Sequence, residues 1–452
     1  MDNNNLQIIS ALRQRLERGR DGSVTQTLPN CVLVFREDPL FAGAIRFNAL
    51  SGRIFFARDM GWKRFGEGIT DNDLNNIYLY MQNTYGIRND RRIQQALHIV
   101  AQENAVHPIR EYLESLTWDG TPRIRHALHH FLGAPDDDLT EACLRMFMLG
   151  AIQRVFKPGC KFEYVLTLVG GQGIGKSTFF RFLAVQDKWF SDDLSGFRSP
   201  RIFEKISGHW IIEMSEMLAV LNTGSSEEAK AFLSRQADVY REPYATLPND
   251  RPRQCVFGAT TNRVKCLPFD RTGNRRFLPI LVDEEQAEVH ILADEKASRA
   301  YFDQLWAEAV AIYRSGSFSL KFTQEMESHL RAHSREFMAE DTLAGMIQEF
   351  LDNYDGDRVC TAQLFRDALH NPYGKPSRQD SMEIGDIMRY SISGWRPCGI
   401  QRFEEFGRQR AWERVNKVCQ QSDENPERGP GTGENAVISG LSGEEKSFQD
   451  PC

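Results

Sequence analysis

The stretch YVLTLVGGQGIGKSTFFRFL, residues 164–183, decides the fold of this chain. Its apolar run from Tyr164 to Val169 predicts a buried β-strand, and a helical pattern follows directly after Ser177. Between them stands Gly, four residues, then Gly-Lys-Ser, which is the phosphate-binding P-loop in its full strand-loop-helix context. We therefore expect an α/β domain that binds a nucleoside triphosphate.

Each residue type in this loop has a physical reason. Glycines let backbone N–H groups face phosphate oxygens, and the helix that begins there presents its positive dipole end to the same anion. Lys176 is expected to hold the β- and γ-phosphates of ATP, and the Ser177 hydroxyl to ligate Mg²⁺. The predicted nucleotide-binding residues are Gly170, Gly171, Gln172, Gly173, Ile174, Gly175, Lys176, Ser177 and Thr178.

The next apolar segment, HWIIEMSEM at 209–217, starts as a buried strand and ends in two carboxylates, Glu213 and Glu216. Hydrolysis of ATP needs an acid that orients the attacking water and takes its proton. We favour Glu216 for that role and as the Mg²⁺ ligand beside Ser177, with Glu213 as the second choice. The alternative is that one of the two only faces solvent.

Two further segments complete the predicted catalytic set. CVFGATTN (255–262) is an apolar strand whose terminal Asn262 is placed to contact the γ-phosphate or the water, or else simply starts a turn. RTGNRRFLPI (271–280) puts Arg275 and Arg276 just before another strand. A guanidinium presented to the transferring phosphoryl group speeds hydrolysis, and in ring ATPases it comes from the neighbouring subunit. Alone, paired arginines usually mark a solvated face.

Composition places the chain among ordinary globular proteins, with 41% hydrophobic and 26% charged residues. The net charge of −7 argues against indiscriminate coating of nucleic acid. Residues 416–452 contribute −4 of it and read as a disordered tail, so the rest is near −3. No apolar stretch is long enough for a membrane helix and the start lacks a signal peptide's apolar core, so we expect a cytoplasmic protein without membrane contact.

The remaining polar clusters have structural interpretations. The 9 cysteines are scattered and include no CxxC pair, which supports neither a disulfide framework nor a zinc site. His126, His129 and His130 have helical spacing, but no neighbouring residue completes a ligand set, so a surface or packing role is favoured. Asp136 to Asp138 stand where a helix begins and are expected to complement its dipole.

The rest of the chain predicts flanking domains. Strands are expected at 30–35 and 52–57, helices at 6–16, 70–85 and 294–315, and strands at 209–214, 239–246, 254–260 and 276–282 around a helix at 226–237. From 342 the order is helix, strand, helix capped by Thr361, helix, hairpin, which is the order of a winged-helix domain. The predicted domains are an N-terminal α/β domain (1–100), a helical collar (101–160), the ATPase domain (161–335), a winged-helix-like domain (336–415) and the acidic tail (416–452).

The motifs GGQGIGKST, IIEMSEM, LSRQADVYREPY, FGATTN and GNRRFLPI, in this order and spacing, resemble the virulence-associated protein E family. The similarity extends upstream through HPIREYLESLTWDGTPRI (107–124). Members of that family are encoded largely by prophages and phage satellites, and their ATPase core resembles superfamily 3 helicases of the AAA+ class. The resemblance implies a P-loop AAA+ core in a hexameric, ATP-driven DNA helicase that starts replication of a mobile element, with a primase or other replication protein as partner.

The same resemblance implies a hairpin that projects into the pore of the ring. VYREPYATLPNDRPRQCVF (239–257) has this form, with two arms around Pro248 to Asp250. Its Arg241, Arg251 and Arg253 are the predicted contacts to single-stranded or forked DNA, because arginine binds phosphate through two parallel hydrogen bonds. The alternative is that these arginines pair with local acids.

The predicted winged helix is also basic. Residues 387–415 hold six arginines against three glutamates, interleaved with Trp395, Phe403, Phe406 and Trp412. This is a plausible nucleic-acid face, although the aromatics are more typical of a core. Two functions therefore stay open: a DNA helicase that hydrolyses ATP, and an AAA+ switch or scaffold that acts in phage interference without unwinding DNA.

Overall fold

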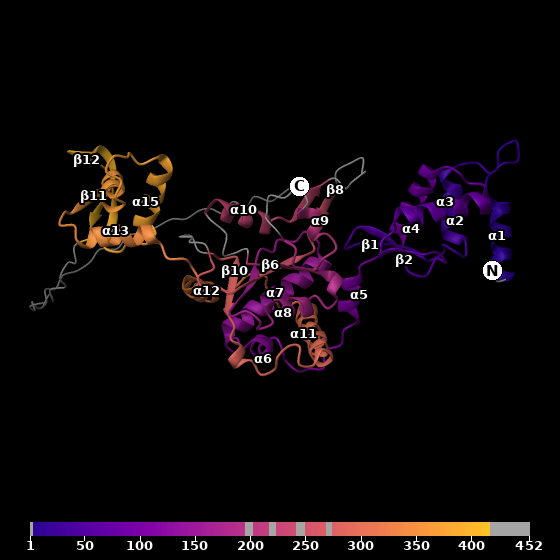
Figure 1. Cartoon of the computed structure of the whole chain (residues 1–452), viewed down its shortest axis with the longest axis horizontal. Coiled ribbons are helices and arrows are strands. Elements are labelled where there is room, and N and C mark those ends of the chain that lie inside the picture. The colour runs from indigo at the N-terminus through magenta and orange to yellow at the C-terminus, as the bar shows by residue number, and fades with distance from the viewer. Residues whose placement is uncertain (1–2, 195–201, 217–222, 241–248, 268–273, 416–452) are drawn as a thin grey trace, which may run out of the picture. The chain divides into compact units, whose positions relative to one another are not determined.

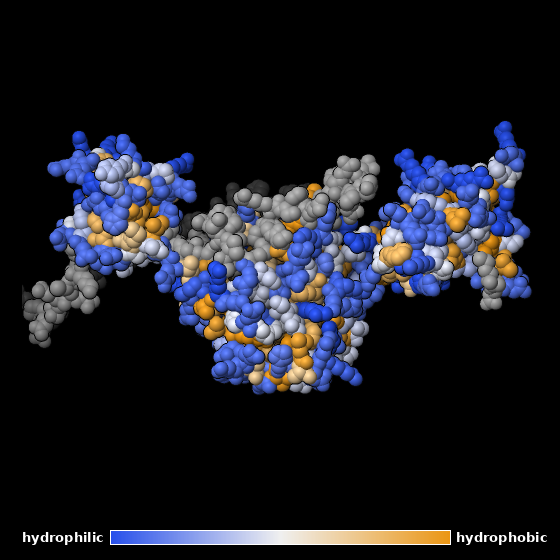
Figure 2. All heavy atoms as spheres, in the orientation of Figure 1, coloured by the Kyte–Doolittle hydropathy of each residue, from blue (hydrophilic) through white to orange (hydrophobic). Residues whose placement is uncertain are grey.

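The computed structural model describes residues 3–194, 202–216, 223–240, 249–267 and 274–415. The chain divides into two compact units, Met1–Thr342 and Leu343–Cys452 (Figure 1). On the visible face hydrophilic residues predominate, and hydrophobic residues form smaller areas among them (Figure 2). No described helix is both long and apolar enough to cross a membrane.

The N-terminal part of the first unit is mixed α/β, as the sequence predicts. Strand β1 pairs antiparallel with β2 and parallel with β3, and Val34, Phe35, Ile77 and Met81 lie in one buried core beside the sheet. Its elements are α1 (Asn3–Arg15), α2 (Leu28–Glu37), β1 (Ile45–Asn48), β2 (Arg53–Phe56), α3 (Asp71–Tyr85), α4 (Asp90–Glu103) and β3 (Ala105–Val106).

The predicted strand at 30–35 is wrong, because this stretch lies in α2. Pro29 stands in the first helical turn, where its missing N–H costs nothing. Cys31, Val34 and Phe35 are buried at helical spacing, whereas Val32 and Leu33 are only half-buried. A short apolar run fits the periodicity of a strand as well as that of a helix, and here its packing against α4 favours the helix.

Three helices lead from this part to the P-loop: α5 (Pro108–Ser115), α6 (Ala127–Leu132) and α7 (Asp138–Phe156). Asp137 caps α7, since its carboxylate accepts the backbone N–H of Thr140 at 2.8 Å. The expected capping role of this acidic run is confirmed for Asp137. Asp138 stands in the first turn of α7, as the dipole role requires, and Asp136 and Asp138 also pair with Arg125, at 3.4 and 2.7 Å.

The centre of the first unit is a parallel five-stranded sheet in the order β10-β4-β9-β6-β5. The strands are β4 (Val165–Val169), β5 (Phe190–Ser191), β6 (Ile211–Ser215), β9 (Val256–Thr261) and β10 (Phe277–Leu281). A short 3₁₀ helix, η1 (Asp187–Trp189), precedes β5, and another, η3 (Glu284–Gln286), follows β10. This confirms the predicted α/β sheet, and β5 is a strand that the sequence does not indicate.

Both faces of the sheet are buried. Leu166 and Leu168 enter a core with α7, α8 (Lys176–Leu183) and α11 (Glu295–Ser315). Val165 and Val169 point into a second core with α9 (Ile202–Ile206), α10 (Thr223–Leu233) and the residue after α12 (Gln324–Glu336). Alternate residues of one strand thus serve two cores, which is why the strands of a parallel sheet read as continuous apolar runs.

Helix α11 matches its prediction. Asp294 caps its start by accepting the N–H of Ala297, and Gly316 ends it with φ 71°. Leu305 and Ala309, four residues apart on one face of the helix, are fully buried.

The predicted hairpin is present as β7 (Ala237–Tyr240) and β8 (Asn249–Pro252), but its turn lies elsewhere. The sequence places the turn at 248–250, whereas Asn249 and Asp250 already pair with Tyr240 and Val239. The connection is therefore within 241–248, outside the described residues. Pro248 misleads here because proline is accepted next to a strand start as well as in a turn.

The second unit has the predicted order of elements around its own core of Ile347, Leu364, Ile387 and Trp412. The elements are α13 (Thr342–Asp352), β11 (Arg358–Cys360), α14 (Thr361–Gln363) continued by a π-helical turn (Leu364–Ala368), α15 (Arg378–Tyr390), β12 (Trp395–Phe403) and β13 (Gly407–Arg414). The three strands are antiparallel in the order β11-β13-β12. One detail is corrected: Cys360 precedes α14, and Thr361 is its first helical residue rather than its cap.

Candidate active site

The P-loop joins β4 to α8 through glycines that the backbone requires. Gly173 and Gly175 have φ of 91° and 98°, which residues with a side chain rarely adopt. Gly170 is needed for space, because a Cβ there would lie 2.3 Å from the carbonyl oxygen of Val282. Of the other loop residues, Ile174 is buried, Thr178 half-buried and Gln172 exposed.

The ammonium group of Lys176 is held inside the loop. Nζ donates to the carbonyl oxygen of Gly170 at 2.9 Å, to that of Gly171, and to Asn262 Oδ1 at 3.1 Å. Burial lowers the pKa of Lys176, and the nearby Glu216 and Glu213 oppose that shift. All three partners are neutral oxygens, so phosphate oxygens would be stronger acceptors for the same ammonium group.

Glu213 lies beside the P-loop serine and is fully buried. Its Oε1 accepts hydrogen bonds from Ser177 Oγ at 2.6 Å and from Thr260 Oγ1 at 2.5 Å. Its Oε2 is also buried and has no hydrogen-bond partner among the described residues. A carboxylate oxygen in that condition suits a hard cation, so Ser177 and Glu213 fit the Mg²⁺ that accompanies ATP.

Glu216 follows directly after β6 in a left-handed backbone conformation, with φ 53°. Its carboxylate accepts the backbone N–H of Asn262 and the hydroxyl of Thr261, both at 3.2 Å. Non-glycine residues in this region are strained and cluster at functional sites. Because Glu216 is exposed, its carboxylate is open to water, in contrast to that of Glu213.

The strand order explains why these residues meet. The carboxyl ends of parallel strands share one edge, and β9 lies between β4 and β6. Asn262, at the end of β9, therefore bridges Lys176 and Glu216. The sequence-based prediction does not single out Thr260 and Thr261, whose hydroxyls donate hydrogen bonds to the two glutamates. Two consecutive threonines at the end of a strand, directly before Asn262, are the pattern that could have indicated them.

Arg275 and Arg276 lie at the opposite edge of the sheet. They precede β10, which runs parallel to β4, so a strand of roughly 16 Å separates them from the P-loop of their own chain. Arg276 is anchored, since Nε donates to Glu163 at 3.2 Å and to Ser234 Oγ at 3.1 Å. Arg275 contacts Glu163 at 3.5 Å, and its side chain is 65% exposed.

The three hairpin arginines differ in what they can contact. Arg241 lies outside the described residues. Arg251 lies on β8 with its guanidinium packed against Gly52. Arg253 is buried, forms a bidentate ion pair with Asp238 at 2.9 and 2.6 Å, and stacks on Phe232. For Arg253 the alternative of pairing with a local acid is therefore the correct one, and this arginine is not available to DNA.

Replacing Arg253 with alanine is expected to destabilise the first unit by about 3–5 kcal/mol, because Asp238 would keep a buried charge without its partner. Urea denaturation measures the free energy of unfolding. Arg331→Ala, which removes an exposed pair with Glu327, is the control and is expected to change stability little. An equal, small loss in both variants would contradict a structural role for Arg253.

The parallel sheet, the glycine loop and the acidic edge beside Lys176 and Ser177 together define a P-loop NTPase. Residues 113–339, about half of the chain, match the model of the virulence-associated protein E-like domain. The chain belongs to this family, which confirms the resemblance seen in its motifs.

Other comparisons give weaker likenesses. None of the curated proteins compared with the chain matches it. Among solved structures, the chain is similar to three apo structures of the NrS-1 C-terminal region, at 10–11% sequence identity. Their TM-scores are 0.39, 0.42 and 0.43, and the matches cover 67%, 82% and 85% of this chain and 78%, 96% and 99% of those chains.

Proposed function

We propose that this chain is an ATP-hydrolysing DNA motor of the AAA+ class, which acts as a ring of six copies. It would separate DNA strands in the cytoplasm when a prophage or phage satellite starts to replicate, together with a primase or other replication protein. The observation that carries the proposal is the division of catalytic groups between two edges of one sheet. Lys176 and the acids line the carboxyl edge, and Arg275 projects from the amino edge.

In a ring, the amino edge of one subunit would face the carboxyl edge of the next. Arg275 of one copy would then reach the γ-phosphate bound to its neighbour, which it cannot reach in its own chain. Arg276 and Glu163 would position it, because their ion pair fixes the backbone just before β10. The pKa of Glu163 is lowered: burial raises it, but the Ser234 hydroxyl and the two arginines outweigh that effect, so Glu163 stays charged as an anchor.

We assign different roles to the two glutamates. The sequence favours Glu216 as the metal ligand, but Glu213 is the one that contacts Ser177, so we propose Ser177 and Glu213 for Mg²⁺. When bound, Mg²⁺ neutralises charge on the phosphates. Glu216, open to water, would accept the proton of the attacking water, while the backbone N–H of Asn262 holds the Glu216 carboxylate and the Asn262 side chain accepts from Lys176.

Replacing Glu216 with glutamine is expected to slow ATP hydrolysis by about 10²–10⁴-fold with ATP binding retained, because the proton acceptor is lost. Glu213→Gln is expected instead to raise the Mg²⁺ concentration that gives half-maximal rate. Hydrolysis measured over a Mg²⁺ titration separates the two, with the exposed Glu340→Gln as control. The reverse pattern, a Mg²⁺ defect confined to Glu216→Gln, would exchange the assigned roles.

The second unit supports a nucleic-acid partner. We propose that it is a winged-helix-like domain whose wing is β12–β13. Arg402 and Arg408 lie directly opposite each other in that hairpin, and Arg410 lies on the same face. Like charges in such a pair are unfavourable without an anion. Within the described residues no acidic side chain pairs with these three exposed arginines, whereas Arg396 does pair with Glu413. A phosphate backbone would supply the missing charge.

The aromatic residues of this unit have another role. Trp412 is buried and Trp395 packs against the same core, while Phe406 lies under the guanidinium of Arg366. The preference for core over stacking therefore holds for both tryptophans. Proposed DNA contacts are Arg402, Arg408 and Arg410 on the wing, and Arg251 and Arg241 on the hairpin.

A strand-displacement assay tests this function. Protein that forms a six-subunit ring by mass measurement in ATP should unwind a forked DNA duplex, and the triple variant Arg402→Gln, Arg408→Gln and Arg410→Gln should bind DNA more weakly with a smaller salt dependence. If the ring forms and hydrolyses ATP but separates no strands, the switch or scaffold function replaces the helicase.

A further inference from the structure

Outside the nucleotide site, the fold gathers two histidines and a glutamate at one point. His126 Nε2 lies 3.1 Å from Glu288 Oε1, and His130 Nδ1 lies 2.6 Å from Glu288 Oε2. One donor atom from each of the three residues lies within 4.8 Å of the others. The sequence predicts no such set, because Glu288 is 158 residues from His130 and comes from the loop after η3.

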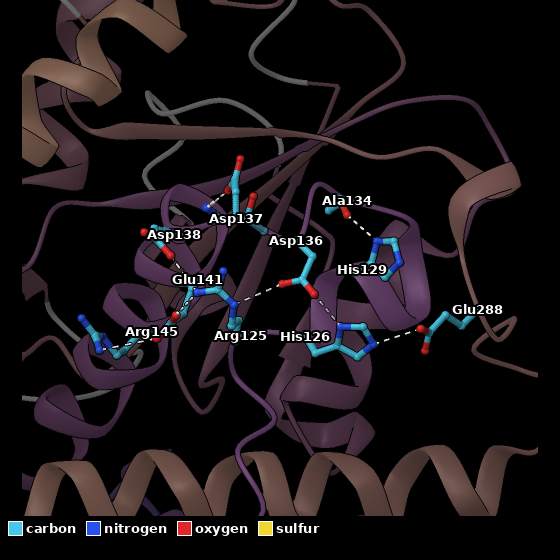
Figure 3. Close-up of polar contacts among 11 residues, drawn as sticks. Arg125, His126, His129, Ala134, Asp136, Asp137, Asp138, Glu141, Arg145 and Glu288 are labelled. Atoms are coloured by element: carbon cyan, nitrogen blue, oxygen red, sulfur yellow. Dashed lines mark hydrogen bonds and ion pairs between the residues drawn. The ribbon is translucent and has the colours of Figure 1, made fainter.

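The fourth member of the cluster is a carboxylate behind the first histidine. Asp136 Oδ2 lies 3.1 Å from His126 Nδ1, so His126 stands between Asp136 and Glu288 (Figure 3). A hydrogen bond from Nδ1–H to Asp136 leaves the lone pair of Nε2 directed toward Glu288. Histidines that ligate metals nearly always donate their other ring N–H to a carboxylate or carbonyl in this way.

The three donor residues are held in place before any ligand arrives. The carbonyl oxygen of His130 accepts the backbone N–H groups of Glu288 and Val289, both at 3.1 Å, which fixes the glutamate beside the helix. The ring of Tyr301 stacks on that of His130, with centroids 5.1 Å apart and planes 10° from parallel. The ring of His129 lies 5.2 Å from that of His126, and its Nδ1 contacts the carbonyl oxygen of Ala134 at 2.8 Å (Figure 3).

We propose that His126, His130 and Glu288 form a binding site for a divalent transition metal, with Zn²⁺ as the ion of choice. Two imidazoles and one carboxylate are an established zinc ligand set, and the half-exposed position leaves room for a water as fourth ligand. Asp136 is a positioning residue that orients His126. The packing role expected for these histidines also holds for His130, whose ring stacks on Tyr301, and His129 has no place in the proposed ligand set.

The site lies where it would join two segments that border the P-loop. Asp283 N–H donates to the carbonyl oxygen of Leu132, and Gly175 packs against Leu132 and Ile291, since a Cβ on Gly175 would lie 2.9 Å from Ile291 Cγ2. A metal would fasten α6 to the loop that follows β10. Its detection does not depend on ATP hydrolysis, so the site and the proposed function can fail separately.

Equilibrium titration of the nucleotide-free full chain with Zn²⁺ tests the site. The wild-type chain is expected to bind one Zn²⁺. The affinity for this ion should be at least about 100-fold lower in His130→Ala and in the conservative, surface-exposed variant Glu288→Gln. Asp136→Asn should weaken binding by about 10–100-fold. His129→Ala, on the same helix, is the matched control and should bind as tightly as wild type. Circular dichroism checks that each variant is folded.

Co²⁺ substitution identifies the ligands. The proposed site should give the visible absorption of a low-symmetry cobalt centre without the thiolate-to-cobalt band that a cysteine ligand produces, and this absorption should be absent in His130→Ala. Three results would each overturn the proposal. The first is the same Zn²⁺ affinity and the same number of bound ions in wild type, His130→Ala and Glu288→Gln. The others are a thiolate-to-cobalt band and no Zn²⁺ uptake by the wild-type chain.

Discussion

Replacing Lys176 with alanine is expected to reduce the rate of ATP hydrolysis by at least about 10²–10³-fold, the usual cost of removing one preorganised donor from a transition state. Lys176 is the only described cation inside the loop of residues 170–177, and its ammonium group already lies between two loop carbonyls and Asn262. Steady-state release of phosphate measures the rate.

The matched control is Lys321→Ala, which removes an exposed lysine far along the chain from the P-loop. It should hydrolyse ATP at the wild-type rate. Because Lys176 is buried, a folding defect must be separated from a catalytic one, and Lys176→Met keeps most of the apolar contact. If Lys176→Met is folded and still hydrolyses ATP at close to the wild-type rate, the P-loop assignment is wrong.

The second large loss of ATP hydrolysis is expected when Arg275, of the pair Arg275 and Arg276, is replaced. Arg275→Ala should lower hydrolysis by about 10³–10⁵-fold if its guanidinium reaches the transferring phosphoryl group of a neighbour. Mixing Arg275→Ala with Lys176→Ala chains should restore part of the rate. In such a ring, an intact P-loop from one chain meets an intact arginine from the other.

Arg276 provides the comparison for this experiment, because it carries the same charge but is anchored to Glu163 and Ser234. We expect Arg276→Ala to be less severe and Arg276→Lys to recover part of the loss, as for a residue that positions its neighbour. No recovery of rate in any mixture that does form rings would contradict a site shared between subunits.

The sequence identifies the P-loop because all of its determinants are local. The strand, the glycines and the helix stand next to one another, and the required φ at Gly173 and Gly175 explains why those residues are glycine. The same holds for α11, whose cap at Asp294 and end at Gly316 can be read from neighbouring residues.

Roles that depend on side-chain direction could not be read in this way. Glu213 lies within β6 and Glu216 directly after it, and they differ in the burial of Glu213, its contact with Ser177 and the left-handed backbone of Glu216. Arg253 is similar, because its pairing with Asp238 depends on the register of β7 and β8, and that register depends on where the turn falls. The contact between His130 and Glu288 depends entirely on the tertiary fold.

The most direct test is the rate of ATP hydrolysis by the wild-type chain with and without single-stranded DNA, at protein concentrations where rings form. A DNA-driven motor predicts hydrolysis that single-stranded DNA accelerates several-fold and that Lys176→Ala abolishes under both conditions. Hydrolysis that is unchanged by DNA across a range of salt concentrations, in protein that assembles normally, would contradict a DNA motor and favour a nucleotide-dependent switch.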